Sequence, residues 1–299
     1  MTLSQLLRAV TKICQVGAWF KTVPQAFPRS PYATRACVVL WWAGTLLRVS
    51  SAEHLERWIR AGKFRRLAPG FPSADTLRRH LAALPPDLWH GWVRRIAQRL
   101  AQMRAWSRVG GHRVVALDGV EWFSQHAVQC ADCTTRVIDE VPQYVHKAVV
   151  ASVIGAVPIV LEWEAQRPGE TDLKGEAEWR AVQRLLPRLW TAFHHQIEVV
   201  VADAECCTQV FLQAVRARGW DAVVRLKNER LTIWQDAQGL WQLTPPVVNR
   251  RDWQLWDLSD LAWGPVTDLR VVVWPRWAGS GGGRRAGSRP PRSSTRAGR

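Results

Sequence analysis

Two aspartates stand at matching places in the sequence, each directly after a run of apolar residues. Asp118 follows the run at residues 114–117, and Asp203 follows the run at residues 199–202. Such runs predict buried strands. Two carboxylates held side by side repel each other unless a cation lies between them, and Mg²⁺ accepts oxygen ligands while leaving room for phosphate oxygens. The pattern predicts a metal site for Mg²⁺, with Mn²⁺ as an alternative, although an Asp-Gly pair such as Asp118-Gly119 is also ordinary turn chemistry.

A pair of such ions suits one reaction in particular. Two divalent ions about 4 Å apart activate an attacking oxygen and stabilise a leaving oxygen during in-line displacement at phosphorus. Asp118 and Asp203 are therefore the candidate catalytic residues and the candidate metal ligands. The chemistry they suggest is the cleavage or transfer of a phosphodiester.

Five expected strands surround these aspartates. The strands are expected over residues 112–123, 146–155, 157–166, 197–205 and 220–230, and helices over 175–193 and 208–219. Gly155-Ala156 predicts the hairpin between the second and third strands. The resulting order is β-β-β-α-β-α-β, an α/β arrangement in which both aspartates fall at the ends of central strands.

The residues before the expected sheet are helical and strongly basic. Residues 1–108 hold eighteen Lys and Arg against four Asp and Glu, a net charge of +14, whereas residues 109–277 carry −4 and residues 278–299 carry +6. Helices are expected over residues 2–15, 33–49, 51–62, 73–84 and 86–106, with Ser51 and Ser73 as N-caps and Pro86 in a first turn. Short helices with basic faces favour a helix-turn-helix type of DNA-binding domain, although any basic helical bundle has this composition.

Several features exclude other classes of protein. The start of the chain lacks the continuous apolar region of a signal peptide, and the longest apolar run, residues 36–47, is too short to span a bilayer. Six cysteines in 299 residues form no disulfide framework, which favours reduced thiols in a cytoplasm. We expect no membrane partner, since the positive charge is spread through the helices rather than gathered beside one apolar face.

Four blocks of sequence resemble a known family. The blocks ALDGVEWFSQHAVQCADCTTR, PIVLEWEAQRPGE, VVVADAECC and WDAVVRLKNER are similar to the catalytic region of the IS4-type DDE transposases of bacterial insertion sequences, over about residues 70–275. The resemblance implies an RNase H-like mixed sheet with flanking helices, preceded by an all-α amino-terminal domain. It also implies Mg²⁺-dependent nicking of transposon ends and joining to target DNA, in a bacterial cytoplasm at the nucleoid, with room for a homodimer in the DNA complex. Asp118 matches the first acid of the family and Asp203 the second.

The third acid of the family is missing from its expected place. The family carries a Glu within a Tyr-x2-Arg-x3-Glu-x6-Lys signature after an inserted β-rich segment. Here the only tyrosines, Tyr32 and Tyr144, precede Asp203, and the only later glutamates are Glu205 and Glu229. Residues 231–277 are interpreted as the start of the inserted segment, with strands at 231–243 and 269–275. Residues 278–299 contain Gly, Arg, Ser and Pro in bulk and resemble a frameshifted reading of GC-rich DNA, so the chain is expected not to transpose; a natural basic tail, with Glu229 as third acid, is the alternative.

These interpretations divide the chain into four parts: a basic helical DNA-binding domain at 1–108, an RNase H-like core at 109–230, the inserted segment at 231–277 and a disordered tail at 278–299. A nuclease of the same fold that cuts without joining remains open. So does a DNA-binding remnant without catalysis.

Other residues suggest secondary roles. Cys130 and Cys133 form half of a zinc site, which His126, His146 or the Cys206-Cys207 pair would complete. Glu205 lies two residues beyond Asp203 and shares its face if the strand continues, and Glu121 lies three residues beyond Asp118. His194-His195 is expected in a surface loop. Lys227 and Arg230, at the end of the fifth expected strand, are positioned to contact DNA phosphate.

Overall fold

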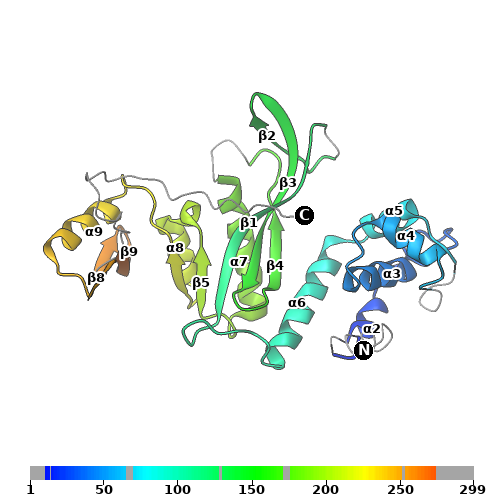
Figure 1. Ribbon diagram of the computed structural model, residues 1–299, viewed down its shortest axis with the longest axis horizontal. Coiled ribbons are helices and arrows are strands. Elements are labelled where there is room, and N and C mark those ends of the chain that lie inside the picture. The colour runs from blue at the N-terminus through cyan, green and yellow to red at the C-terminus, as the bar shows by residue number, and fades with distance from the viewer. Residues whose placement is uncertain are drawn as a thin grey trace. The chain divides into compact units, whose positions relative to one another are not determined.

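The computed structural model divides the chain into two compact units, Met1–Arg225 and Leu226–Arg299 (Figure 1). It describes residues 11–13, 15–64, 70–127, 130–170, 176–250 and 253–273. The expected boundary after residue 108 lies inside the first unit, so the basic helices and the sheet form one compact body. The expected tail at 278–299 and most of the expected helix at 2–15 lie outside the described residues.

The amino-terminal helices include three that begin where Ser51, Ser73 and Pro86 predict, and one, at residues 16–20, that was not expected. They are α2 (Val16–Phe20), α3 (Thr34–Leu46), α4 (Ala52–Arg60), α5 (Ala74–Ala82) and α6 (Pro86–Gln102). The Ser51 hydroxyl accepts a hydrogen bond from the backbone N–H of His54, and the Ser73 hydroxyl accepts one from Thr76. These bonds satisfy N–H groups that a helix start leaves without an intrahelical partner, so both predicted N-caps are confirmed.

The longest apolar run of the sequence forms the centre of this helical bundle. On α3, Cys37, Leu40 and Ala43 are buried, and they pack in one cluster with Leu55 of α4 and Leu77 of α5. The run is therefore a core helix, as its length predicted. In the described part of the chain, no helix is long and apolar enough to cross a membrane.

A mixed six-stranded sheet follows. Its strands are β1 (Val114–Gln125), β2 (Thr134–Ile138), β3 (Val141–Val153), β4 (Ile159–Ala165), β5 (Val199–Ala202) and β6 (Asp221–Val224). The order is β2-β3-β1-β5-β6, and β4 pairs with the edge of β3 that also carries β2. β3 is antiparallel to β1, β2 and β4, whereas β1, β5 and β6 are mutually parallel. The hairpin predicted at Gly155-Ala156 joins β3 to β4.

The strands differ from expectation in length and number. β2 was not expected, because its five residues follow the Cys130–Cys133 turn and include a polar stretch. β1 continues past Asp118 instead of ending there, because β3 pairs with it as far as Gln125. β6 ends at Val224, so the strand expected over 220–230 is shorter than predicted, and Lys227, Glu229 and Arg230 lie beyond it.

Helices α7 (Glu176–Phe193) and α8 (Gln209–Arg216) pack beside the sheet. α7 contacts β3 and β4, α8 contacts β6, and the Trp179 ring of α7 meets the Phe211 ring of α8 edge-on at 6.1 Å. The buried face of α7 includes Leu185, Leu189 and Phe193, spaced as one face of a helix requires. This packing holds the start of α7 beside Gly119 of β1 and beside Asp203, the residue after β5.

The second unit is a helix against a small antiparallel sheet. α9 (Thr232–Leu243) packs on β8 (Gln254–Trp263), which lies between β7 (Val248–Asn249) and β9 (Val266–Val273). The strand expected at residues 231–243 is therefore wrong. Its apolar side chains repeat with helical spacing: Ile233 and Ala237 are buried, and Trp241 contacts the Trp256 ring at 6.2 Å.

Candidate carboxylate metal centre

The register of the parallel strands brings the two candidate aspartates together. The pairing of β1 with β5 runs from Val114↔Val199 to Leu117↔Ala202. Asp118 and Asp203 are the next residues on each strand, and Asp203 keeps an extended backbone. One further step of the same register sets them opposite each other, on the same face of the sheet, about 4.8 Å apart at the backbone. Both side chains are exposed.

A third carboxylate, which the sequence analysis did not single out, lies at this point. The ligand atoms of Glu178, Asp203 and Cys206 all lie within 4.8 Å of one another, whereas the Asp118 carboxylate lies outside that group. Glu178 comes from the first turn of α7, and its Oε2 lies 3.1 Å from the place where a Cβ on Gly119 would be. Gly119 thus leaves space for the Glu178 carboxylate beside Asp118, which gives the Asp-Gly pair a role beyond turn formation.

The pKa of Glu178 depends on the other acids around it. Burial raises the pKa of Glu178, and the charges of Asp203, Glu205 and Asp118 raise it further, in that order of size. Lys147 on β3 acts in the opposite direction. A half-buried carboxylate among three others is costly to ionise, and a bound cation would remove that cost.

The protonation state of the neighbouring Cys206 thiol bears on which metal fits the cluster. Burial first, and then Glu178 and Asp203, raises the pKa of Cys206 to about 12. A thiol binds metal as the thiolate. Without a bound cation, Cys206 is therefore a buried, protonated thiol at neutral pH. The remaining donors are carboxylate oxygens, which suit Mg²⁺ or Mn²⁺.

The acids that follow each aspartate closely, Glu121 and Glu205, behave differently from each other. Glu121 continues along β1 and forms an ion pair with Arg136 of β2 at 2.6 Å. Glu205 leaves the strand direction, because residues 204–206 form a 3₁₀ turn. The Glu205 N–H donates a hydrogen bond to Asp203 Oδ1 at 2.9 Å. Glu121 is thus paired with Arg136, whereas the charge of Glu205 raises the pKa of Glu178 in the cluster.

The remaining candidates divide between the two units. Lys227, Glu229 and Arg230 are exposed and belong to the second unit, with Glu229 in a turn before α9. His194 and His195 lie in the turn that follows α7, as expected, and the His194 ring stacks on Trp190 at 4.9 Å. Cys130 and Cys133 gather with His146, not with His126 or the Cys206-Cys207 pair.

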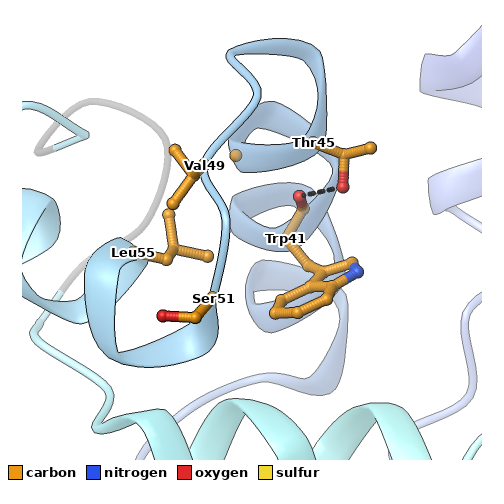
Figure 2. Close-up of a pocket in the computed structure, with 6 residues that line it drawn as sticks. Trp41, Thr45, Val49, Ser51 and Leu55 are labelled. Carbon is orange, nitrogen blue, oxygen red and sulfur yellow. Dashed lines mark hydrogen bonds between the residues drawn. The ribbon is translucent and has the colours of Figure 1, made fainter. Parts of the chain in front are cut away.

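A pocket in the helical bundle offers no competing centre (Figure 2). It lies between α3 and α4, and no acid, histidine or cysteine lines it. Its polar groups include the Thr45 hydroxyl, which donates to the Trp41 carbonyl at 3.0 Å. The lining residues are Trp41, Gly44, Thr45, Val49, Ser51 and Leu55.

Comparisons with known proteins leave the family open. No protein-family model matches the sequence, and no curated protein matches it. The crystal structure of a pre-cleavage Mos1 transpososome matches over 63% of this chain and 77% of that chain, with 15% identity and a TM-score of 0.21. A TM-score of this size supports no conclusion about fold or function. The fold and site themselves define a mixed α/β protein with a carboxylate cluster at the point where the parallel pairing of β1 and β5 ends.

Proposed function

We propose that this protein is a DNA-binding protein of the IS4-type DDE transposase class, with an RNase H-like sheet that holds Mg²⁺ at Asp118, Asp203 and Glu178. The observation that carries the proposal is the register of β1 and β5. It sets Asp118 opposite Asp203, while α7 brings Glu178 within 4.8 Å of Asp203. The β-β-β-α-β-α-β order expected for this class recurs once the short β2 is set aside, which supports the interpretation.

The chain's own residues have distinct roles in this proposal. Asp118 would supply an oxygen ligand from within β1, Asp203 one from the residue directly after β5, and Glu178 a third from a helix start, where the helix dipole favours a negative charge. Mg²⁺ bound there would activate an attacking oxygen and stabilise the leaving oxygen of a phosphodiester. Gly119 leaves the space that Glu178 occupies, and Lys147 is close enough to affect its charge.

Metal binding tests the site directly. Asp118→Asn and Asp203→Asn should each weaken Mn²⁺ or Mg²⁺ binding at least tenfold, measured by calorimetry. The fold should survive, since Asn at position 203 can still accept the hydrogen bond that caps residues 204–206. Glu121→Asn is the matched control, because Arg136 already neutralises that acid. If the doubly substituted Asp118→Asn, Asp203→Asn protein binds the metal as well as the parent, the site is wrong.

The catalytic part of the proposal has its own test. The family's signature Glu is absent beyond Asp203, so we expect this chain to bind metal but to cleave DNA slowly or not at all. The assay measures Mg²⁺-dependent nicking and strand transfer on DNA from both sides of the gene. It compares this chain with one whose reading frame is restored after Trp277. Equal activity in both would show that the acids already present are sufficient, and nicking without joining would favour the nuclease alternative. Absence of both activities in the restored chain would favour a DNA-binding remnant.

A further inference from the structure

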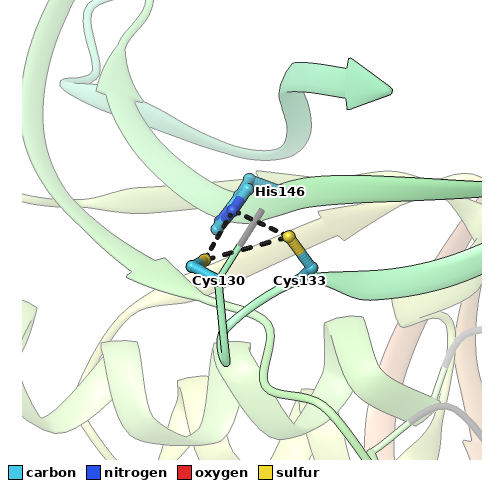
Figure 3. A group of neighbouring side chains, drawn as sticks. All are labelled: Cys130, Cys133 and His146. Atoms are coloured by element: carbon cyan, nitrogen blue, oxygen red, sulfur yellow. Dashed lines mark hydrogen bonds between the residues drawn. The ribbon is translucent and has the colours of Figure 1, made fainter. Parts of the chain in front are cut away.

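A second group of metal-ligating side chains lies away from the carboxylates. Cys130 and Cys133 belong to the connection between β1 and β2, and His146 lies on β3 (Figure 3). The sheet register explains why they meet. Thr134 of β2 pairs with Val145 of β3, so Cys133, directly before Thr134, lies opposite His146, directly after Val145. The three side chains point toward one another in Figure 3.

The distance between the two sulfurs matches that of a tetrahedral metal site, and the distances from the sulfurs to the histidine are a few tenths of an ångström shorter than in one. The two Sγ atoms are 3.8 Å apart, and His146 Nε2 lies 3.2 Å from Cys130 Sγ and 3.4 Å from Cys133 Sγ. A tetrahedral zinc with Zn–S of about 2.3 Å and Zn–N of about 2.0–2.1 Å separates two thiolates by roughly 3.8 Å, and a thiolate from an imidazole nitrogen by roughly 3.6 Å. The sulfurs are also much farther apart than the roughly 2.05 Å of a disulfide bond.

We propose that Cys130, Cys133 and His146 bind one Zn²⁺ ion, with solvent in the fourth position. Thiolate and imidazole ligands favour zinc over Mg²⁺, so this site and the carboxylate cluster select different metals. The Cys130–Cys133 spacing is that of a zinc-binding turn, and the Cys133 N–H donates to the Cys130 carbonyl at 3.3 Å. Cys130 is exposed, which leaves the ion open to solvent on that side.

The ion would have a structural effect on the sheet. It would link the connection that follows β1 to β3, next to the residues at which β2 pairs with β3. The Trp122 ring lies 6.0 Å from the His146 ring, so the ligand lies against the continuation of β1 beyond Asp118. Zinc would therefore stabilise the part of the β1–β3 pair that extends beyond Asp118, without taking part in chemistry at the carboxylates.

Binding to the full chain tests the proposal. The protein, reduced and stripped of metal, is titrated with Zn²⁺ against a chromophoric chelator, and with Co²⁺ to follow the thiolate charge-transfer band. We expect one equivalent of Zn²⁺, a tetrahedral Co²⁺ spectrum, and at least a tenfold loss of affinity in Cys133→Ser and His146→Asn. The controls Cys207→Ser and His126→Asn should retain the parent affinity. A parent without a zinc equivalent, or controls that lose as much as the cluster variants, would overturn the proposal.

A measurement without substitutions guards against misfolded variants. Zn²⁺ should slow the alkylation of Cys130 and Cys133 in the parent, read by mass spectrometry, at least tenfold, and leave Cys207 unchanged. Alkylation of Cys130 and Cys133 at the same rate with and without Zn²⁺ would show that the cluster does not bind the ion.

Discussion

Single residues determine the charge balance of the candidate centre. Glu178 matters most for how the candidate centre is interpreted, because it adds a carboxylate from a helix to the carboxylates of Asp118 and Asp203. Its raised pKa reflects the cost of gathering these acids without a cation. A substitution that removes the charge should therefore affect folding and metal binding in opposite directions.

Replacing Glu178 with Gln should stabilise the metal-free protein by roughly 0.5–2 kcal/mol at neutral pH. Folding raises the pKa of Glu178 above its ordinary value of 4.5, so the parent should lose stability as the pH rises through and above 4.5, until the group is ionised in both states. Unfolding followed against pH in the presence of a chelator should show this slope in the parent and a smaller slope in Glu178→Gln.

The same variant should lose the stabilisation that Mg²⁺ gives the parent. Glu229→Gln is the matched control, since Glu229 is exposed and was the alternative third acid. Loss of the Mg²⁺ effect in Glu229→Gln, with the effect intact in Glu178→Gln, would assign the third ligand to Glu229.

At the scale of elements, charged contacts hold together the strands and helices that position the centre. The carboxylate of Glu198, directly before β5, accepts hydrogen bonds from the backbone and side chain of Arg113, directly before β1, at 3.0 and 3.1 Å. These bonds join the two strands at the start of the register that ends at Leu117 and Ala202, directly before the aspartates.

Replacing Glu198 with Gln should cost at most about 1 kcal/mol, because the side chain is partly exposed. The hydrogen bond from the Arg113 backbone, and then the Arg113 side chain, hold the pKa of Glu198 below its ordinary value of 4.5. Its contribution is therefore present above pH 4.5 and declines as the pH falls through the lowered pKa. Urea unfolding should show a difference between parent and variant at pH 7 that shrinks in acid; a constant difference would contradict this.

A buried ion pair connects α6 to the edge of the sheet. Glu162 of β4 is fully buried and contacts His90, and Arg94 Nε lies 2.8 Å from its Oε2. The His90 ring stacks on Trp163 at 4.1 Å. This contact helps make the basic helices and the sheet one compact unit.

Replacing Glu162 with Gln should lower the free energy of unfolding by about 1–3 kcal/mol, since the buried carboxylate would lose its charge beside His90 and the partly exposed Arg94. Glu140→Gln, at an exposed turn, is the control. The measurement is the urea midpoint of each protein, and equal losses in both would show that the buried pair contributes nothing specific.

For the whole molecule, the uneven charge distribution predicts where DNA binds. Residues 1–108 carry +14, and Arg29, Arg35, Arg57 and Arg95 among them are exposed. Because α6 packs on β4, an isolated fragment is a poor test, and charge substitutions in the full chain are preferable.

Replacing these four arginines with Gln should weaken DNA binding and reduce the slope of log affinity against log salt by roughly 0.9 for each phosphate that the protein no longer neutralises. The matched control replaces Arg225, Lys227, Arg230 and Arg250, which are also exposed. Fluorescence anisotropy at several salt concentrations measures both sets. A larger change in the control set would move the DNA surface to the later residues.

Local patterns in the sequence were sufficient for some features of this protein. Apolar runs predicted the strands that carry Asp118 and Asp203, and Ser51 and Ser73 predicted helix starts, because strand burial and capping depend on adjacent residues. The same approach misassigned α9, where a short apolar pattern fits both a strand and a helix.

Other features emerged from the three-dimensional fold alone. Glu178 meets Asp203, His146 rather than His126 meets the cysteines, and the basic helices share one unit with the sheet. These outcomes depend on strand register and helix packing, which bring together residues far apart in the chain and leave no local signal in the sequence.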